Sequence, residues 1–334
     1  MKNKDFSFKI SKPIFLSFAF SVIFILIPWQ TILPKIYFTD RLTYQYIVES
    51  GFNKILVGNY FDSFYSYLTY EWLWEYILYV TFEKMSISFD TIFLFITFFN
   101  VLLSSYLISK YSKHSYLIFF LNPWYFDFLY SQSRLCFAIS LIFLSFILKR
   151  YKLLSILIVS STFFIHTSVI LFLLIFLLVY LVYKDVFFNQ KIFKIFFIFI
   201  VAILISFLTG NFLINILSSL GDRRTETYGD INFNVSVANM LPWLLFYLIF
   251  ISKFFKSNLF DEYYNYLAFF FLTLVMFSSF VFGGYALRYL VVGYPIILIS
   301  FSNILRSKEK ILFFFIYFCY IFLAWFFRLF IIEG

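Results

Sequence analysis

Two arginines stand where apolar segments begin, a position suited to binding an anion. Arg134 directly precedes the apolar run 135–148, and Arg288 lies in the first turn of the run 285–302. A guanidinium donates forked N–H groups that match phosphate or carboxylate oxygens. A helix N-terminus adds unpaired N–H groups and a partial positive charge. We interpret both as anion-binding residues. The alternative is an ion pair with a nearby carboxylate, such as Asp127, which shares a face with Arg134 if one helix runs through both.

A single histidine between two apolar segments is a candidate for proton transfer. His166 stands in the sequence Phe-Phe-Ile-His-Thr-Ser. An imidazole at a membrane boundary either contacts a ligand, moves a proton, or is satisfied by a neighbouring hydroxyl, and these interpretations have equal weight. The other histidine, His114, stands among lysines and is expected to be solvated.

A polar and aromatic segment, 34–88, has the composition of a sugar-binding surface. Its carboxylates, which include Asp40, Glu71 and Glu75, alternate with tyrosines and tryptophans. In a helix Glu71 and Glu75 would share one face. Aromatic rings pack on apolar sugar faces while carboxylates accept from hydroxyls. The alternative is an interfacial aromatic belt with solvated acids. A second polar segment, 221–230, either closes over a substrate or solvates an outer face.

These residues belong to a chain that is too apolar to be a soluble protein. Of 334 residues, 63% are hydrophobic and 13% are charged, and the mean hydropathy is +0.91, against about 25% charged in soluble domains. Although the net charge is +9, the basic residues are scattered between apolar blocks, which excludes a nucleic-acid surface. The two cysteines predict neither a disulfide nor a metal site. Nucleotide-binding, zinc-binding and serine-hydrolase motifs are missing from the sequence.

The apolar runs predict an all-α, polytopic integral membrane protein with about 11–12 transmembrane helices. The whole chain, 1–334, forms a single polytopic membrane domain. A weak block, 68–82, contains two glutamates and is predicted not to cross. The predicted spans are 14–33, 89–107, 116–132, 135–148, 153–166, 168–183, 192–209, 238–252, 263–282, 285–302 and 311–331.

The charge distribution predicts which way the chain faces. With the N-terminus cytoplasmic, most lysines lie on the inside, as the positive-inside rule requires. The larger loops 34–88 and 210–237 are then external. Most arginines fall on the external side, against the topological trend. For three of these, anion binding and simple ion pairing are equally weighted: Arg223, Arg224 and Arg328.

Short motifs in order along the chain resemble the EpsG/Wzy-type polysaccharide polymerases. The segment from Tyr130 to Leu141 resembles their Arg-x-x-x-Ala helix start, and His166-Thr-Ser their His-x-Ser step one helix later. The sequence departs from many relatives at Leu135, where they have Gln, and it lacks a Pro beside Glu71. Further matches are Asp40 to Tyr44, Tyr70 to Trp72, and Arg288 with Tyr289.

The resemblance implies a glycosyltransferase of the bacterial inner membrane, with its active site facing outward. It would join oligosaccharide units carried on undecaprenyl pyrophosphate into O-antigen, capsular or exopolysaccharide, without a cofactor or metal. Membrane lipids, a chain-length regulator and a flippase are the implied partners. For such a reaction our hypothesis is that the catalytic residues are Asp40, Glu71 and His166, and that the pyrophosphate-binding residues are Arg134, Arg288, Arg223 and Arg224.

Two other functions remain compatible with the sequence. A flippase or transporter of lipid-linked oligosaccharide would line a path through the bilayer with charges, whereas here the charges gather at helix ends. A membrane O-acetyltransferase acting on the polysaccharide would need an acyl-donor path from the cytoplasm, for which the sequence offers no motif.

Overall fold

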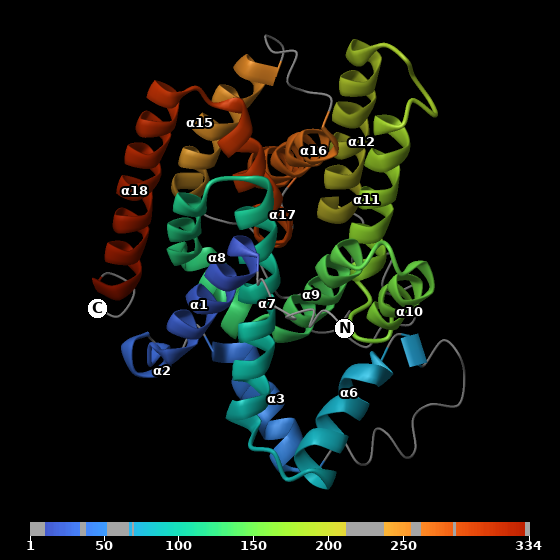
Figure 1. The fold of residues 1–334 in the computed structure, drawn as a ribbon, viewed down its shortest axis with the longest axis vertical. Coiled ribbons are helices and arrows are strands. Elements are labelled where there is room, and N and C mark those ends of the chain that lie inside the picture. The colour runs from blue at the N-terminus through green and yellow to red at the C-terminus, as the bar shows by residue number, and fades with distance from the viewer. Residues whose placement is uncertain are drawn as a thin grey trace, which may run out of the picture.

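The described part of the chain is entirely helical in its regular elements (Figure 1). The computed structural model describes residues 11–33, 38–51, 67–68, 70–211, 237–254, 262–282 and 285–330. Within these ranges there are α-helices, short 3-10 or π segments and no strand. The predicted all-α class is confirmed.

The N-terminal half builds the lower part of the molecule in Figure 1 and the C-terminal half the upper part. The first elements are α1 (Lys12–Leu26), α2 (Trp29–Ile32), α3 (Thr39–Glu49), α6 (Trp72–Leu78), η2 (Tyr79–Lys84), α7 (Phe89–Tyr111), η3 (His114–Leu121), α8 (Pro123–Tyr130) and α9 (Ser133–Ile147). The later elements are α10 (Lys152–Thr162), α11 (Val169–Tyr183), α12 (Lys191–Asn211), α15 (Val237–Phe254), α16 (Tyr263–Phe277), η5 (Ser278–Phe282), α17 (Ala286–Ile304) and α18 (Ser307–Phe330).

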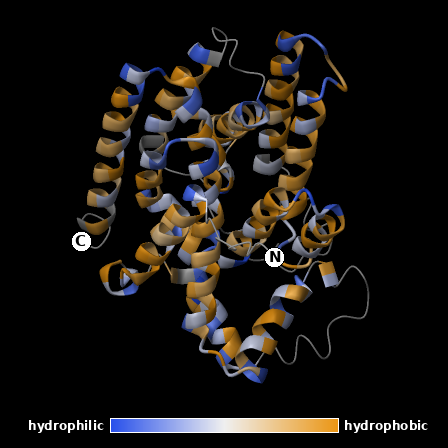
Figure 2. Ribbon diagram, in the orientation of Figure 1, coloured by the Kyte–Doolittle hydropathy of each residue, from blue (hydrophilic) through white to orange (hydrophobic). Residues whose placement is uncertain are grey.

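Several of these helices are long and apolar enough to cross a membrane, so the polytopic prediction is confirmed. Five pass by length and composition in the described residues, or six if the bent pair α8 and α9 counts as one span. The predicted number, about 11–12, also counted shorter segments such as α10 and α11, which have 11 and 15 residues. Hydrophobic residues cover most of the ribbon (Figure 2).

The core is built around α16 and α17, which pack closely against each other. Nearly every side chain of α17 from Tyr289 onward is buried. Gly293 makes the close approach possible, because a Cβ at this position would lie 2.6 Å from Cγ of Phe271 on α16. By contrast, only 17% of the apolar stretch of α18 is buried. Most of the apolar surface of this helix therefore faces outward.

A sharp break between α8 and α9 sets the direction of Arg134. The two helices are bent by 96°. At the break, the backbone N–H groups of Ser131 and Gln132 both donate to the carbonyl of Asp127. The condition for pairing Arg134 with Asp127, one helix that runs through both residues, is therefore not met. Helix α8 ends at Tyr130, and α9 begins at Ser133 with Arg134 as its second residue.

The weak block 68–82 forms the short helix α6 followed by the π segment η2, and neither is among the candidate spans. Glu71 is the residue before α6 and has a φ of 55°, in the left-handed region. A non-glycine residue there is unfavourable by about 1–2 kcal/mol. The N–H of Leu73 donates to the carbonyl of Phe164 at 2.9 Å, which fastens α6 to the turn between α10 and α11.

Candidate active site

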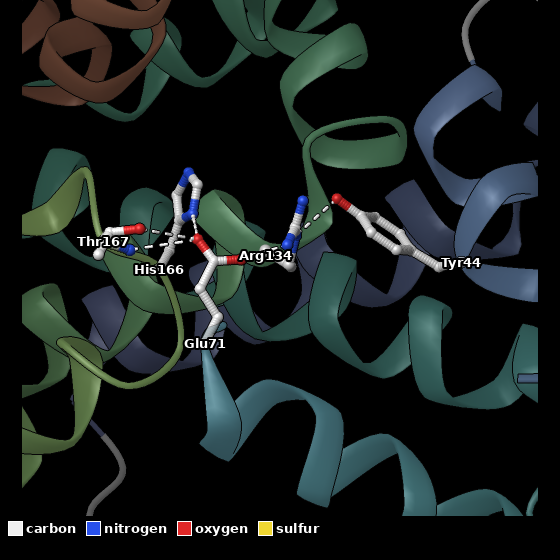
Figure 3. A network of polar contacts seen from close by, with 5 residues as sticks. All are labelled: Tyr44, Glu71, Arg134, His166 and Thr167. Carbon is white, nitrogen blue, oxygen red and sulfur yellow. Dashed lines mark hydrogen bonds and ion pairs between the residues drawn. The ribbon is translucent and has the colours of Figure 1, made fainter. Parts of the chain in front are cut away.

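Four segments that are distant in sequence meet around the side chain of Glu71 (Figure 3). They are α3, the N-terminus of α6, the N-terminus of α9 and the turn that joins α10 to α11. Their contributions are Tyr44, Glu71, Arg134, His166 and Thr167. The break before α9 and the attachment of α6 to the turn are what bring these segments together.

Glu71 is the hub of this cluster and is almost completely buried, with a relative exposure of 1%. One carboxylate oxygen, Oε2, pairs with Nη1 of Arg134. The other, Oε1, lies 2.5 Å from Nδ1 of His166. It also accepts from the backbone N–H and the hydroxyl of Thr167, each at 3.2 Å. These contacts compensate the cost of burying a carboxylate and of its left-handed backbone.

Arg134 makes three contacts with two residues, Glu71 and Tyr44. Its Nη1 contacts Glu71, its Nε donates to the hydroxyl of Tyr44 at 2.7 Å, and its guanidinium lies 4.8 Å from the centre of the Tyr44 ring. About a fifth of the side chain remains exposed, at 19%. Its Nη2 makes no hydrogen bond with any residue in the described part of the chain. A fixed guanidinium with a remaining donor is suited to an anionic ligand.

Asp40 and Arg288 are two further charged groups near the cluster. Asp40 lies four residues before Tyr44 on α3, and its side chain is exposed. Desolvation by the surrounding protein raises the pKa of the Asp40 carboxyl, and Arg288 and Arg134 partly oppose this rise. Arg288 lies in the first turn of α17, with its guanidinium 4.3 Å from the centre of the Tyr285 ring. It is also within electrostatic range of His166.

The structure thus gathers five of the residues selected from the sequence: Asp40, Glu71, Arg134, His166 and Arg288. Arg134 pairs with Glu71 and not with Asp127, and the amide of Gln132 donates to Asp127 instead. The other two predicted arginines, Arg223 and Arg224, lie outside the described residues, as does the side chain of Arg328.

Sequence reasoning missed two residues of the cluster as site residues. Tyr44 was named only within the family match, although its spacing of four positions from Asp40 places both on one helix face. Thr167 is adjacent to His166, but nothing in the sequence predicts that both its N–H and its hydroxyl point at Glu71. Glu75 is also buried nearby and acts electrostatically on Arg134.

Aromatic rings of the predicted sugar-binding segment divide between the core and a second face. Trp74 is fully buried and packs edge-on against Tyr44. The rings of Trp72 and Tyr76 stack with their centres 5.1 Å apart and lie outside the buried side of α6. The ring centre of Tyr67 lies 5.5 Å from that of Trp72. Of the two stacked rings, Trp72 is half-buried and Tyr76 is exposed. In the described residues, no three His, Cys, Asp or Glu side chains are arranged as metal ligands.

Comparison with known families decides the relationship of the chain. The model of the EpsG family matches residues 18–334, nearly the whole length. The chain belongs to the EpsG family. The resemblance inferred from the Arg134, His166 and Arg288 motifs is confirmed at this level. No curated protein and no solved structure matches this EpsG family chain.

Proposed function

We propose that this EpsG family member is a polysaccharide polymerase. It joins repeat units carried on undecaprenyl pyrophosphate into O-antigen, capsular or exopolysaccharide, at the outer face of the bacterial inner membrane. Membership of the family supports the class of function. The observation that carries the proposal is the placement of Arg134 and Arg288 at two helix N-termini beside the exposed carboxylate of Asp40.

The cationic side of the site suits a diphosphate leaving group. Arg134 and Arg288 stand at the starts of α9 and α17, where unpaired backbone N–H groups strengthen the positive potential. Negative charge develops on the pyrophosphate as its bond to the sugar breaks. Fixed cations at that position stabilise the transition state more than the ground state. His166 adds a further polar contact from the turn between α10 and α11.

The reaction transfers a glycosyl group with its atoms balanced. A hydroxyl oxygen of the acceptor unit forms a bond to the anomeric carbon of the donor chain, while its proton passes to a carboxylate. The bond from that carbon to the pyrophosphate oxygen breaks. Its electron pair stays on the oxygen, so that undecaprenyl pyrophosphate leaves. The candidate acceptors of the proton are Asp40 and Glu71, both of which lie beside Arg134.

The surroundings of the site suit a lipid-linked substrate. The cluster lies at the ends of apolar helices, so a polyprenyl chain in the bilayer would bring its pyrophosphate to the arginines. In our proposal the N-terminus is cytoplasmic and the cluster faces outward, as the lysine distribution favours. In this proposal the stacked rings of Trp72 and Tyr76 contact the sugars.

A gel of surface polysaccharide tests this function. A strain that lacks the gene is complemented with wild type, with Arg134→Ala, or with Arg150→Ala as a control at an exposed arginine. We expect a full ladder from wild type and the control, and a single-unit band from Arg134→Ala, with equal amounts of each protein in the membrane. A normal ladder from Arg134→Ala contradicts the proposed role of this residue.

The same gel separates the polymerase from its alternatives. Loss of even the single-unit band, with lipid-linked units retained on the cytoplasmic face, indicates a flippase. A full ladder in the deletion strain, with altered acetylation, indicates an O-acetyltransferase. Either result contradicts the polymerase.

A further inference from the structure

We propose that Glu71 is a positioning residue that holds Arg134 and His166 in place, and that Asp40 is the general base. This inference rests on the proposed polymerase function and assigns different roles to its two candidate carboxylates. It follows from the contacts of each carboxylate with its neighbours.

Glu71 has no oxygen turned toward a substrate hydroxyl. Its side chain is 2% exposed. Oε2 is occupied by Arg134, and Oε1 faces three donors from His166 and Thr167. A general base must come within hydrogen-bonding distance of the proton that it removes. Glu71 could do so only by giving up contacts that compensate its burial.

The contacts of Glu71 instead determine which atoms its neighbours present. A carboxylate at Nδ1 of His166 favours the tautomer with a proton on that nitrogen. In Figure 3 the second ring nitrogen, Nε2, points away from Glu71. This atom is the one that His166 offers to a substrate. Similarly, Glu71 and Tyr44 contact Nη1 and Nε of Arg134, so both N–H groups of Nη2 remain for a ligand.

Asp40 has the opposite environment. Asp40 is an exposed residue, and among the described residues the charged groups that act on its carboxyl are Arg288 on α17 and Arg134 on α9, with the Tyr44 hydroxyl on its own helix. Desolvation raises its pKa in spite of the two arginines. A carboxylate with a raised pKa is a stronger base and is more effective in accepting a proton near neutral pH. It also lies next to the cations that would hold the donor.

The different roles predict different pH profiles. A base works in its unprotonated form, so the rate increases as the pH rises through the pKa of Asp40. Because that pKa is raised, this increase lies at higher pH than it would for an ordinary aspartate. This rise of the rate with pH is the acid limb of the profile. Removing the base removes the acid limb. Removing a positioning residue lowers the rate at every pH and leaves the limb in place.

The test uses the full-length protein in lipid vesicles with undecaprenyl-pyrophosphate-linked repeat units. Initial rates are measured from about pH 5 to pH 8 for wild type, Glu71→Gln and Asp40→Asn. Glu83→Gln serves as the control, since Glu83 is an exposed glutamate on η2. We expect Glu71→Gln to lower kcat about 100-fold with the acid limb retained. We expect Asp40→Asn to lower it by about 100-fold or more and to lose the limb.

A binding measurement separates a positioning role from a general loss of structure. Inorganic pyrophosphate is titrated into each purified variant. We expect Glu71→Gln to weaken binding at least tenfold, and Asp40→Asn to keep or improve it, because Asp40 repels an anion. Tyr44→Phe, which keeps the ring under Arg134, provides a milder perturbation of the same guanidinium if Glu71→Gln does not fold.

The outcomes are distinct for the two proposals. Loss of the acid limb in Glu71→Gln, or its survival in Asp40→Asn, overturns the assignment of roles. If wild type makes no polymer although pyrophosphate binding still depends on Glu71, the polymerase function fails and the positioning role stands. If polymer forms but pyrophosphate binding is the same in Glu71→Gln as in wild type, the positioning role fails and the polymerase stands.

Discussion

Separating Glu71 from Arg134 should be among the most costly changes in the protein. Arg134→Met leaves a carboxylate that is 2% exposed without its cation. Removing one partner of a buried ion pair costs about 3–5 kcal/mol. We expect the lower end, about 3 kcal/mol, because Arg134 is 19% exposed and His166 and Thr167 still contact Glu71.

A double-mutant cycle measures this interaction directly. The free energy of unfolding is determined in mixed micelles for Arg134→Met, Glu71→Gln and the double variant. We expect a coupling energy of about 2 kcal/mol, because Glu71→Gln removes the charge that Arg134→Met leaves behind. The matched control is the pair Lys253 and Glu309, whose side chains are 29% and 30% exposed, with an expected coupling below about 1 kcal/mol. A coupling for Glu71 and Arg134 no larger than the control refutes the reasoning.

Two further substitutions test the supports of the site. Tyr44→Phe removes the hydroxyl that accepts from Arg134 Nε but keeps the ring. Because one hydrogen bond contributes about 1 kcal/mol, we expect the affinity for pyrophosphate, measured by titration, to fall a few-fold. An unchanged affinity argues against this contact. Gly293→Ala places a Cβ 2.6 Å from Phe271, so α16 and α17 must move apart. We expect this to lower the free energy of unfolding, measured in micelles, by about 1–3 kcal/mol. An alanine variant as stable as wild type contradicts this close packing.

The membrane fold could be predicted because its signal is distributed over the whole chain. Runs such as 89–107 and 285–302 are long, apolar and bounded by polar residues, and both coincide with buried helices. Shorter runs are ambiguous. The runs 153–166 and 168–183 have similar hydropathy to a span. In the structure, however, α10 ends at Thr162, and a turn separates it from α11, which runs from Val169 to Tyr183.

The residues of the site could be named from the sequence, but their contacts could not. Helix-start positions predicted Arg134 and Arg288 as candidates, and the structure confirms both positions. The partner of Arg134 was not predictable, because it depends on the break after Tyr130 and on a left-handed backbone at Glu71. Glutamate rarely adopts that conformation, and local propensity therefore predicts Glu71 inside a helix, on one face with Glu75. Tertiary contacts override this preference.

Synthesis by the purified protein tests the central claim most directly. Vesicles that contain wild type or Arg134→Ala receive lipid-linked repeat units and no other enzyme, and the chain length and the released undecaprenyl pyrophosphate are measured together. The proposal predicts that wild type makes chains of several units and releases one undecaprenyl pyrophosphate for each bond formed, while Arg134→Ala does neither. Unchanged single units with wild type, under conditions where pyrophosphate binds, would contradict the claim that this protein polymerises them.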